Sequence, residues 1–166
     1  REKANAILSK SLKSNNVPIS REWPYSNISR KVFAEKYMED ESGELRDYKF
    51  YCFAGEPKVL LVASNRFSNH NFNYFDMDFN MLPIVSAVGS QSTEILKKPE
   101  LFEDMKKMAR VLSNGFPHVR VDLYCCNHQV YFGELTFFDS SGFDNMNSDE
   151  WDQKFGSWLL LPEKNK

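Results

Sequence analysis

The stretch that decides the fold is VRVDLY, residues 119–124, followed after a short connection by VYFGELT, residues 130–136. Both segments have the length and the β-branched and aromatic content of strands, so together they predict a hairpin. Alternate side chains of a strand point to opposite faces, which places Arg120 and Asp122 on the face away from the valines and the leucine. Burying such charges costs free energy unless they are paired or bind a ligand. The hairpin therefore combines a core face with a candidate functional face.

The register of this hairpin decides whether Asp122 meets Glu134 of the second strand. A two-residue turn at 127–128 sends Glu134 to the opposite face of the sheet. A three-residue loop at 126–128 places Glu134 opposite Arg120 and diagonal to Asp122, within reach of a shared ion. Asn127 tolerates the left-handed conformation that such a loop needs, so we expect the three-residue loop.

Two carboxylates and a guanidinium on one sheet face suit the chemistry of magnesium and phosphate. Mg²⁺ usually binds one or two carboxylates and completes its shell with phosphates and water. Arg120 can offer its planar fork of donors to a phosphate oxygen. The predicted metal ligands are Asp122 and Glu134. The alternative is a plain ion pair between Arg120 and Glu134 with no ligand.

Hydrophobic spacing along the chain predicts both helices and strands. Helical spacing covers residues 2–14, about 99–113, and the segment from Ser148 onward. Strand patterns cover residues 31–39, 47–54, 57–63, 118–125 and 129–137. The aromatic and asparagine-rich residues 65–83 predict a structured loop with one or two short strands. Strands with separately placed helices indicate an α+β fold with a mainly antiparallel sheet.

The length of 166 residues predicts a single domain. Within it we distinguish a helix and loop over 1–30, a hinge and strands over 31–64, an aromatic loop region over 65–98, and a helix, hairpin and final helix over 99–166. Residue 1 is Arg and not an initiator Met, so we expect the chain to be part of a longer protein.

Composition narrows the class of protein. The chain has 21 basic and 23 acidic residues and a formal charge of −2, so we expect no broad basic face and no nucleic-acid partner. No stretch approaches the roughly 20 apolar residues that cross a bilayer. Three cysteines, two of them adjacent, favour a reducing compartment, and we expect a cytoplasmic protein.

Two further segments carry residues suited to a nucleotide. FAEKYM, residues 33–38, begins apolar and then presents polar groups, and a strand end of this kind can offer backbone donors and acceptors to a purine edge. In DYKFYCF, residues 47–53, Asp47 and Lys49 share a face; Asp47 could accept ribose hydroxyls and Lys49 could face phosphates. The alternative is the exposed start of a strand whose charges stay in water.

Seven motifs, in order, carry a resemblance to a known family. They are REWPY 21–25, AEKY 34–37, DYKFYCF 47–53, RFSNH 66–70, GFPHVRVD 115–122, YFGELTF 131–137 and EWD 150–152. The chain resembles the C-terminal part of the ATP-grasp fold, and most closely the TupA-like ATP-grasp amidoligase family, which is named from teichuronopeptide biosynthesis. The resemblance spans nearly the whole sequence.

The resemblance implies that ATP and Mg²⁺ are the cofactors and assigns the nucleoside contacts. Glu35, Lys36 and Tyr37 fall on the interdomain hinge that binds adenine in this family. Asp47 falls where an acidic residue contacts the ribose.

The resemblance also assigns the phosphate and metal contacts. Asp122 and Glu134 match the two carboxylates that hold magnesium against the nucleotide phosphates. Arg120 matches the basic residue that stabilises the transferred phosphoryl group. By the same resemblance, Lys49 and Arg66 are expected to make further contacts with the phosphates.

The sequence departs from the family pattern in two respects. Thr136 stands where such ligases usually carry Asn, and a hydroxyl is a poorer magnesium ligand than an amide oxygen. The chain also lacks the preceding domain and the Gly-rich lid with its lysine, so we expect half a nucleotide cleft and an incomplete enzyme.

The resemblance implies an ATP-dependent carboxylate–amine ligase that works through an acyl phosphate in cell-surface polysaccharide or teichuronopeptide-type biosynthesis. Its substrates would be a small or glycan-linked carboxylate and amine, and its neighbours other enzymes of surface-polysaccharide biosynthesis. Two alternatives remain, a non-catalytic nucleotide-binding or remnant domain and a glycan-modifying transferase.

Overall fold

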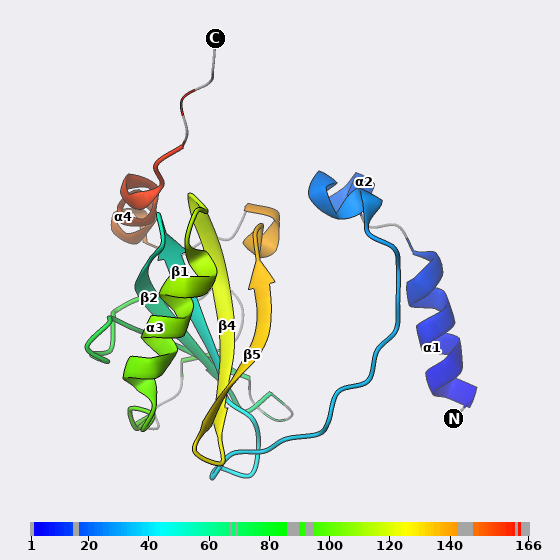
Figure 1. The fold of residues 1–166 in the computed structure, drawn as a ribbon, viewed down its shortest axis with the longest axis horizontal. Helices are drawn as coiled ribbons and strands as arrows, with labels where there is room; N and C mark the ends of the chain where they lie inside the picture. The colour runs from blue at the N-terminus through cyan, green and yellow to red at the C-terminus, as the bar shows by residue number, and fades with distance from the viewer. Residues whose placement is uncertain are drawn as a thin grey trace.

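The computed structural model describes residues 2–14, 17–66, 68, 70–85, 90–91, 95–142, 148–161 and 163. Its centre is a five-stranded sheet in the order β3-β2-β1-β4-β5, with every neighbouring pair antiparallel (Figure 1). The strands are β1 Asp47–Phe53, β2 Glu56–Ser64, β3 Asn71–Phe75, β4 His118–Cys126 and β5 Gln129–Thr136. This arrangement confirms the predicted α+β fold with an antiparallel sheet.

Helices accompany the sheet in two groups. α3 (Phe102–Ser113) and α4 (Asp149–Trp158) pack on it, whereas α1 (Glu2–Lys13) and α2 (Val17–Ser20) belong to an N-terminal arm. Two short 3₁₀ segments, η1 (Trp23–Asn27) and η2 (Asp139–Gly142), complete the elements. Among the described residues no helix is both long enough and apolar enough to span a membrane.

The core lies on both faces of the sheet because alternate strand residues point in opposite directions. One face packs against α3, where Phe50 and Val121 meet Phe102 and Met105. The predicted helix over 99–113 is confirmed, except that it begins at Phe102, whose N–H is accepted by the Pro99 carbonyl.

The opposite face packs against α4 at one end of the sheet. Tyr51 and Phe53 of β1 meet Trp151 and Phe155 of the helix. Ser148 caps this helix by accepting the Trp151 N–H, as the sequence predicts for a helix that starts there. The polar residues described below lie on this same face, on β1, β4 and β5.

The turn of the β4–β5 hairpin corrects the expected three-residue loop. Cys126 pairs with Gln129, so only Asn127 and His128 form the turn, with φ of 51° and 56°. Two consecutive left-handed residues are the geometry of the tight two-residue turns that suit the twist of a hairpin. The prediction was wrong because Asn127 fits a two-residue turn as well as a longer loop.

A β-bulge nevertheless brings the two acids together. Leu123 pairs with Phe132 but Asp122 pairs with Glu134, so Gly133 is an extra residue on β5. A Cβ atom on Gly133 would lie 2.9 Å from the Asp122 carbonyl oxygen, closer than real contacts allow. Glycine therefore permits the close approach, and the bulge places Glu134 directly opposite Asp122.

Residues 31–39, expected to form a strand, form none with any described part of the chain. They run as an extended, exposed segment that joins the arm to β1 (Figure 1), with Phe33 78% and Tyr37 72% exposed. Alternating polarity favours a strand only when a neighbouring strand accepts its backbone hydrogen bonds. The predicted strands β1 and β2 and the short strand β3 within 65–83 are confirmed.

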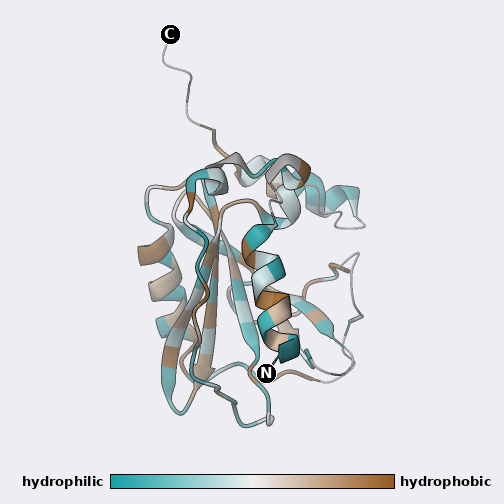
Figure 2. Cartoon of the chain, turned by 90° about the vertical axis from the view of Figure 1, so that its right-hand side faces the viewer, coloured by the Kyte–Doolittle hydropathy of each residue, from teal (hydrophilic) through white to brown (hydrophobic). Residues whose placement is uncertain are grey.

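No described residue of the N-terminal arm belongs to the core. α1 confirms the predicted helix over 2–14, but none of its residues is buried. Apolar and polar residues both show on it in Figure 2. The arm approaches the sheet at η1, where Tyr25 lies edge-on to Phe138 with the ring centroids 6.5 Å apart.

Candidate functional site

A polar cluster lies on the α4-facing surface of the sheet. It is formed by three neighbouring strands: Lys49 of β1 pairs with Asp122 of β4, and Asp122 pairs with Glu134 of β5. Arg120 lies two residues before Asp122 and therefore on the same face. The structure thus brings together four of the residues that the sequence nominates.

Asp122 is the centre of this cluster. Its side chain is 1% exposed, and both carboxylate oxygens are bonded. Oδ1 accepts from Arg120 Nε at 2.7 Å, and Oδ2 accepts from Arg120 Nη2 at 2.9 Å and from Lys49 Nζ at 2.5 Å. Two cations therefore share one buried carboxylate, which offsets the cost of removing it from water.

Arg120 connects this carboxylate to the rest of the site. Its Nη2 also donates to Glu134 Oε1 at 3.2 Å and to Thr136 Oγ1 at 3.1 Å, and its Nη1 donates to Asp139. Burial by itself would lower the pKa of Arg120, but the bonds and charges of Asp122 and Asp139 outweigh burial and raise it. The guanidinium is thus permanently charged and fixed in place.

Asp139 is a site residue that sequence reasoning missed. It lies in η2, 17 to 19 residues beyond Asp122 and Arg120, and its Oδ2 accepts from the Tyr51 hydroxyl at 2.8 Å. Burial raises the pKa of Asp139, but the Arg120 charge and the Tyr51 hydrogen bond more than offset this, so the pKa lies below its usual value. Only its position directly after the predicted strand could have signalled a role.

Asp47 forms the other end of the cluster. Its Oδ2 lies 2.6 Å from Lys49 Nζ and 3.1 Å from Arg66 Nη2. Burial raises the pKa of this carboxyl even though Lys49 and Arg66 act to lower it. Its Oδ1 is buried and has no hydrogen-bond partner among the described residues. Asp47 therefore has one oxygen that is still available to a donor.

A cleft of about 420 Å³ lies beside this end of the cluster. Its walls include Glu35, Lys36 and Tyr37 of the extended segment and Arg66. Aromatic residues of the hairpin also line it, namely Tyr124, Tyr131 and Phe132. The three residues predicted to meet adenine thus share one cleft with a predicted phosphate contact, and Arg66 links that cleft to Asp47.

The two predicted metal ligands can be tested against this geometry. No group of three or more His, Cys, Asp or Glu side chains in the described part of the chain could hold a metal ion. The two predicted ligands are one carboxylate from each of two paired strands, Asp122 of β4 and Glu134 of β5. Asp122 and Glu134 share Arg120 Nη2 between them. A position that already holds a cation between two carboxylates fits Mg²⁺ in charge and donor type, and a metal ion would compete with Arg120 there.

Comparison with known proteins agrees with the fold. A family model described as TupA-like ATPgrasp matches residues 2–160. No curated protein matches the chain, and no solved structure does. Proteins with the ATP-grasp fold generally use ATP and Mg²⁺, and membership suggests a function of the ligase type. With a match over nearly its whole length, the chain belongs to the TupA-like ATP-grasp family.

Proposed function

We propose that this chain carries the nucleotide and metal site of an ATP-dependent carboxylate–amine ligase. One observation supports this above all. The cleft that contains Glu35, Lys36 and Tyr37 adjoins a buried cluster through Arg66. The cluster consists of two cations, Lys49 and Arg120, and two carboxylates, Asp47 and Asp122, on the neighbouring strands β1 and β4. Such an arrangement suits a purine at one end and a polyphosphate at the other.

The polar residues divide into three roles. Asp122 and Glu134 hold Mg²⁺, which neutralises charge on the phosphate oxygens when it is bound. Lys49 and Arg66 bind phosphates, and Asp47 accepts ribose hydroxyls.

Arg120 stabilises the charge on the phosphoryl group in transfer. Asp139 does not touch the reacting atoms; it is a positioning residue that accepts from Arg120 Nη1, whereas Glu134 accepts from Nη2. Thr136 bonds both Arg120 and Glu134 and therefore orients these two groups.

The reaction proceeds in two displacements. A carboxylate oxygen attacks the γ-phosphorus of ATP, the bond to ADP breaks, and an acyl phosphate results. An amine then attacks the acyl carbon, the bond from that carbon to the phosphate oxygen breaks, inorganic phosphate leaves and the nitrogen loses a proton to solvent, giving an amide. The protein contributes positioning and charge neutralisation to both steps. We place the carboxylate and amine, small or linked to a glycan, in cytoplasmic assembly of a cell-surface polymer, beside other enzymes of that assembly.

Substitution of Glu134 by Gln tests the metal assignment. Glu134 is 62% exposed, so the substitution should leave the free energy of unfolding within about 1 kcal/mol of the unsubstituted protein. In the intact enzyme we expect loss of magnesium-dependent ATP turnover, measured as ADP release, and the same loss in Asp122→Asn. Glu56→Gln is the control, because Glu56 is exposed and pairs with Arg110 on the far side of the sheet. Normal turnover in folded Glu134→Gln would exclude the metal role.

A nucleotide-binding domain without catalysis is the second candidate, favoured by the complete pairing of Arg120 with protein carboxylates. A calorimetric titration with Mg-ATP, followed by analysis of the nucleotide, separates the two. The second candidate requires saturable binding with ATP recovered intact when carboxylate and amine substrates are supplied.

A further inference from the structure

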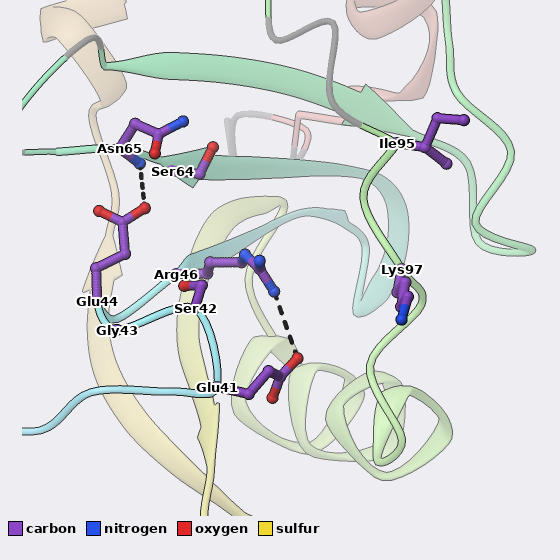
Figure 3. Close-up of a pocket in the computed structure, with 9 residues that line it drawn as sticks. All are labelled: Glu41, Ser42, Gly43, Glu44, Arg46, Ser64, Asn65, Ile95 and Lys97. Atoms are coloured by element: carbon purple, nitrogen blue, oxygen red, sulfur yellow. Dashed lines mark hydrogen bonds and ion pairs between the residues drawn. The ribbon is translucent and has the colours of Figure 1, made fainter.

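A second polar cavity, of about 640 Å³, lies at the ends of β1 and β2, away from the proposed nucleotide site. Loop 41–46 forms one wall; the other lining residues are Ser64, Asn65, Ile95 and Lys97 (Figure 3). By strand alternation Arg46 and Ser64 belong to the α3-facing side, whereas Asp47 and Lys49 belong to the opposite side. The cavity is therefore distinct from the polar cluster, although Glu44 lines both it and the nucleotide cleft.

Arg46 is the residue of this cavity that most clearly indicates a ligand site. Its side chain is only 13% exposed, yet the one described carboxylate within 4 Å is Glu41, at 3.5 Å, and Glu41 is 82% exposed. Well-formed arginine–carboxylate pairs have contacts of about 2.7–2.9 Å and are often bidentate. The charge of Arg46 also acts on the nearby hydroxyl of Tyr48. Burial raises the pKa of that hydroxyl to about 12. A largely buried guanidinium with a long bond to a solvent-exposed acid is poorly neutralised.

The other acidic groups near Arg46, Glu44 and Asp40, accept hydrogen bonds from backbone N–H groups. Glu44 accepts the Asn65 N–H at 2.5 Å (Figure 3). Asp40 accepts from the backbone N–H groups of Ser42 and Arg46 and so closes the loop. Neither makes an ion pair with the guanidinium.

Two further groups suit an anion at this place. Lys97 lies on the wall opposite loop 41–46 (Figure 3). Ser64 is 4% exposed, and its Oγ is buried without a hydrogen-bond partner among the described residues. A buried hydroxyl without a partner costs free energy that a ligand can restore.

We propose that this cavity binds a small oxyanion, a carboxylate or a phosphate, through Arg46 with Lys97 as the second cation. The site does not depend on nucleotide binding, since none of the proposed phosphate contacts lines it. Carboxylate and phosphate share the chemistry that a guanidinium recognises, and two separate probes distinguish them.

The test is a titration of the full chain with inorganic phosphate and, separately, with succinate, followed by amide chemical shifts and by calorimetry at constant ionic strength. We expect saturable shifts at loop 41–46 and at Asn65. Arg46→Gln should weaken binding by about tenfold or more, the size of a lost hydrogen bond to a charged group. Lys97→Ala should weaken it less. Lys98→Ala is the matched control, because Lys98 neighbours Lys97 but does not line this cavity.

Binding of either probe with these losses supports the site, and the probe that binds more tightly identifies the anion. Absence of saturable binding, or an affinity in Arg46→Gln and Lys97→Ala that equals that of the unsubstituted chain, overturns it. Shifts confined to Lys49, Arg66 and Arg120 would also overturn it, because the anion would then occupy the nucleotide site. Circular dichroism checks the folding of Arg46→Gln; if that variant unfolds, exposed Lys97→Ala against Lys98→Ala decides the question.

Discussion

The two faces of the central sheet differ although the same strands build both. On the α3 face Phe50 and Val121 are fully buried among apolar side chains. On the opposite face their chain neighbours Lys49 and Arg120 are largely buried among carboxylates. Phe50 and Val121, in the packed centre of the first face, stabilise the fold and offer no donor or acceptor to a ligand; the Arg46 cavity lies at the edge of that face. The second face holds charges whose pairing can be exchanged for a ligand, and it carries the proposed nucleotide site.

The largest effect is expected on the apolar face. Phe50→Ala removes a ring that is 0% exposed and stacked near Phe102, so unfolding should become easier by about 3–5 kcal/mol. Phe132→Ala is the control, since Phe132 is 54% exposed and its loss should change stability by about 0.5 kcal/mol or less. Urea denaturation measures both. Similar midpoints for the two variants would contradict the distinction between core and surface.

A somewhat smaller loss is expected on the polar face from Arg120→Met. It leaves the buried Asp122 carboxylate with Lys49 alone, and breaking a buried pair on one side costs about 3 kcal/mol or more. Arg110→Met is the matched control, because Arg110 and Glu56 form an exposed pair worth about 1 kcal/mol at most. Equal denaturation midpoints for the two variants would mean that the polar face contributes no more than a surface ion pair.

The bulge that joins the acids is tested by Gly133→Ala. The added Cβ would meet the Asp122 carbonyl at 2.9 Å and the Tyr124 ring at 3.0 Å, so a loss of about 1–3 kcal/mol is expected. Gly156→Ala is the control in α4, where a Cβ meets nothing within 4 Å and the better helix former should add about 0.5–1 kcal/mol. Thermal unfolding of both variants should shift in opposite directions. A higher unfolding temperature for Gly133→Ala would exclude the close approach of β4 and β5 at this bulge.

The smallest effect concerns pH. The pKa of Asp139 is lowered in the folded protein, so its contribution to stability is present above the unfolded value near 3.8 and is lost as pH falls through the folded value. Asp139→Asn should remove on the order of 1 kcal/mol at pH 7 and flatten the acid limb of the stability curve.

Asp47 has the opposite sign, because its raised pKa makes its contribution decline as pH rises above 3.8. The urea midpoint of Asp47→Asn, relative to that of the unsubstituted protein, should therefore rise as the pH increases from 3 to 7. Parallel curves for Asp139→Asn and Asp47→Asn would show that the two ends of the cluster do not differ.

Sequence periodicity predicted the helices and strands whose own apolar residues recur at helical or strand spacing. α3 carries its apolar residues at helical spacing, and β1, β2 and β4 alternate or run apolar as buried strands do. The segment 31–39 failed because a strand requires a neighbour that periodicity does not reveal.

Of the site, the alternation of VRVDLY predicted that Arg120 and Asp122 share a face, and the motif order nominated Glu134 and Lys49. Asp139 could not be predicted, because it reaches Arg120 from a loop beyond the hairpin. The pairing of Asp122 with Glu134 was expected for the wrong reason, since a bulge and not a long turn achieves it.

The sequence by itself determined which residues share a face and which family the chain resembles, because both depend on local order along the chain. Only the tertiary structure decided how Asp122 and Glu134 meet, and that Arg120 lies between them. Those facts depend on a two-residue turn, on the close approach that Gly133 permits and on a loop returning Asp139 to the sheet. Each is a contact between separate segments, and no pattern within one segment specifies it.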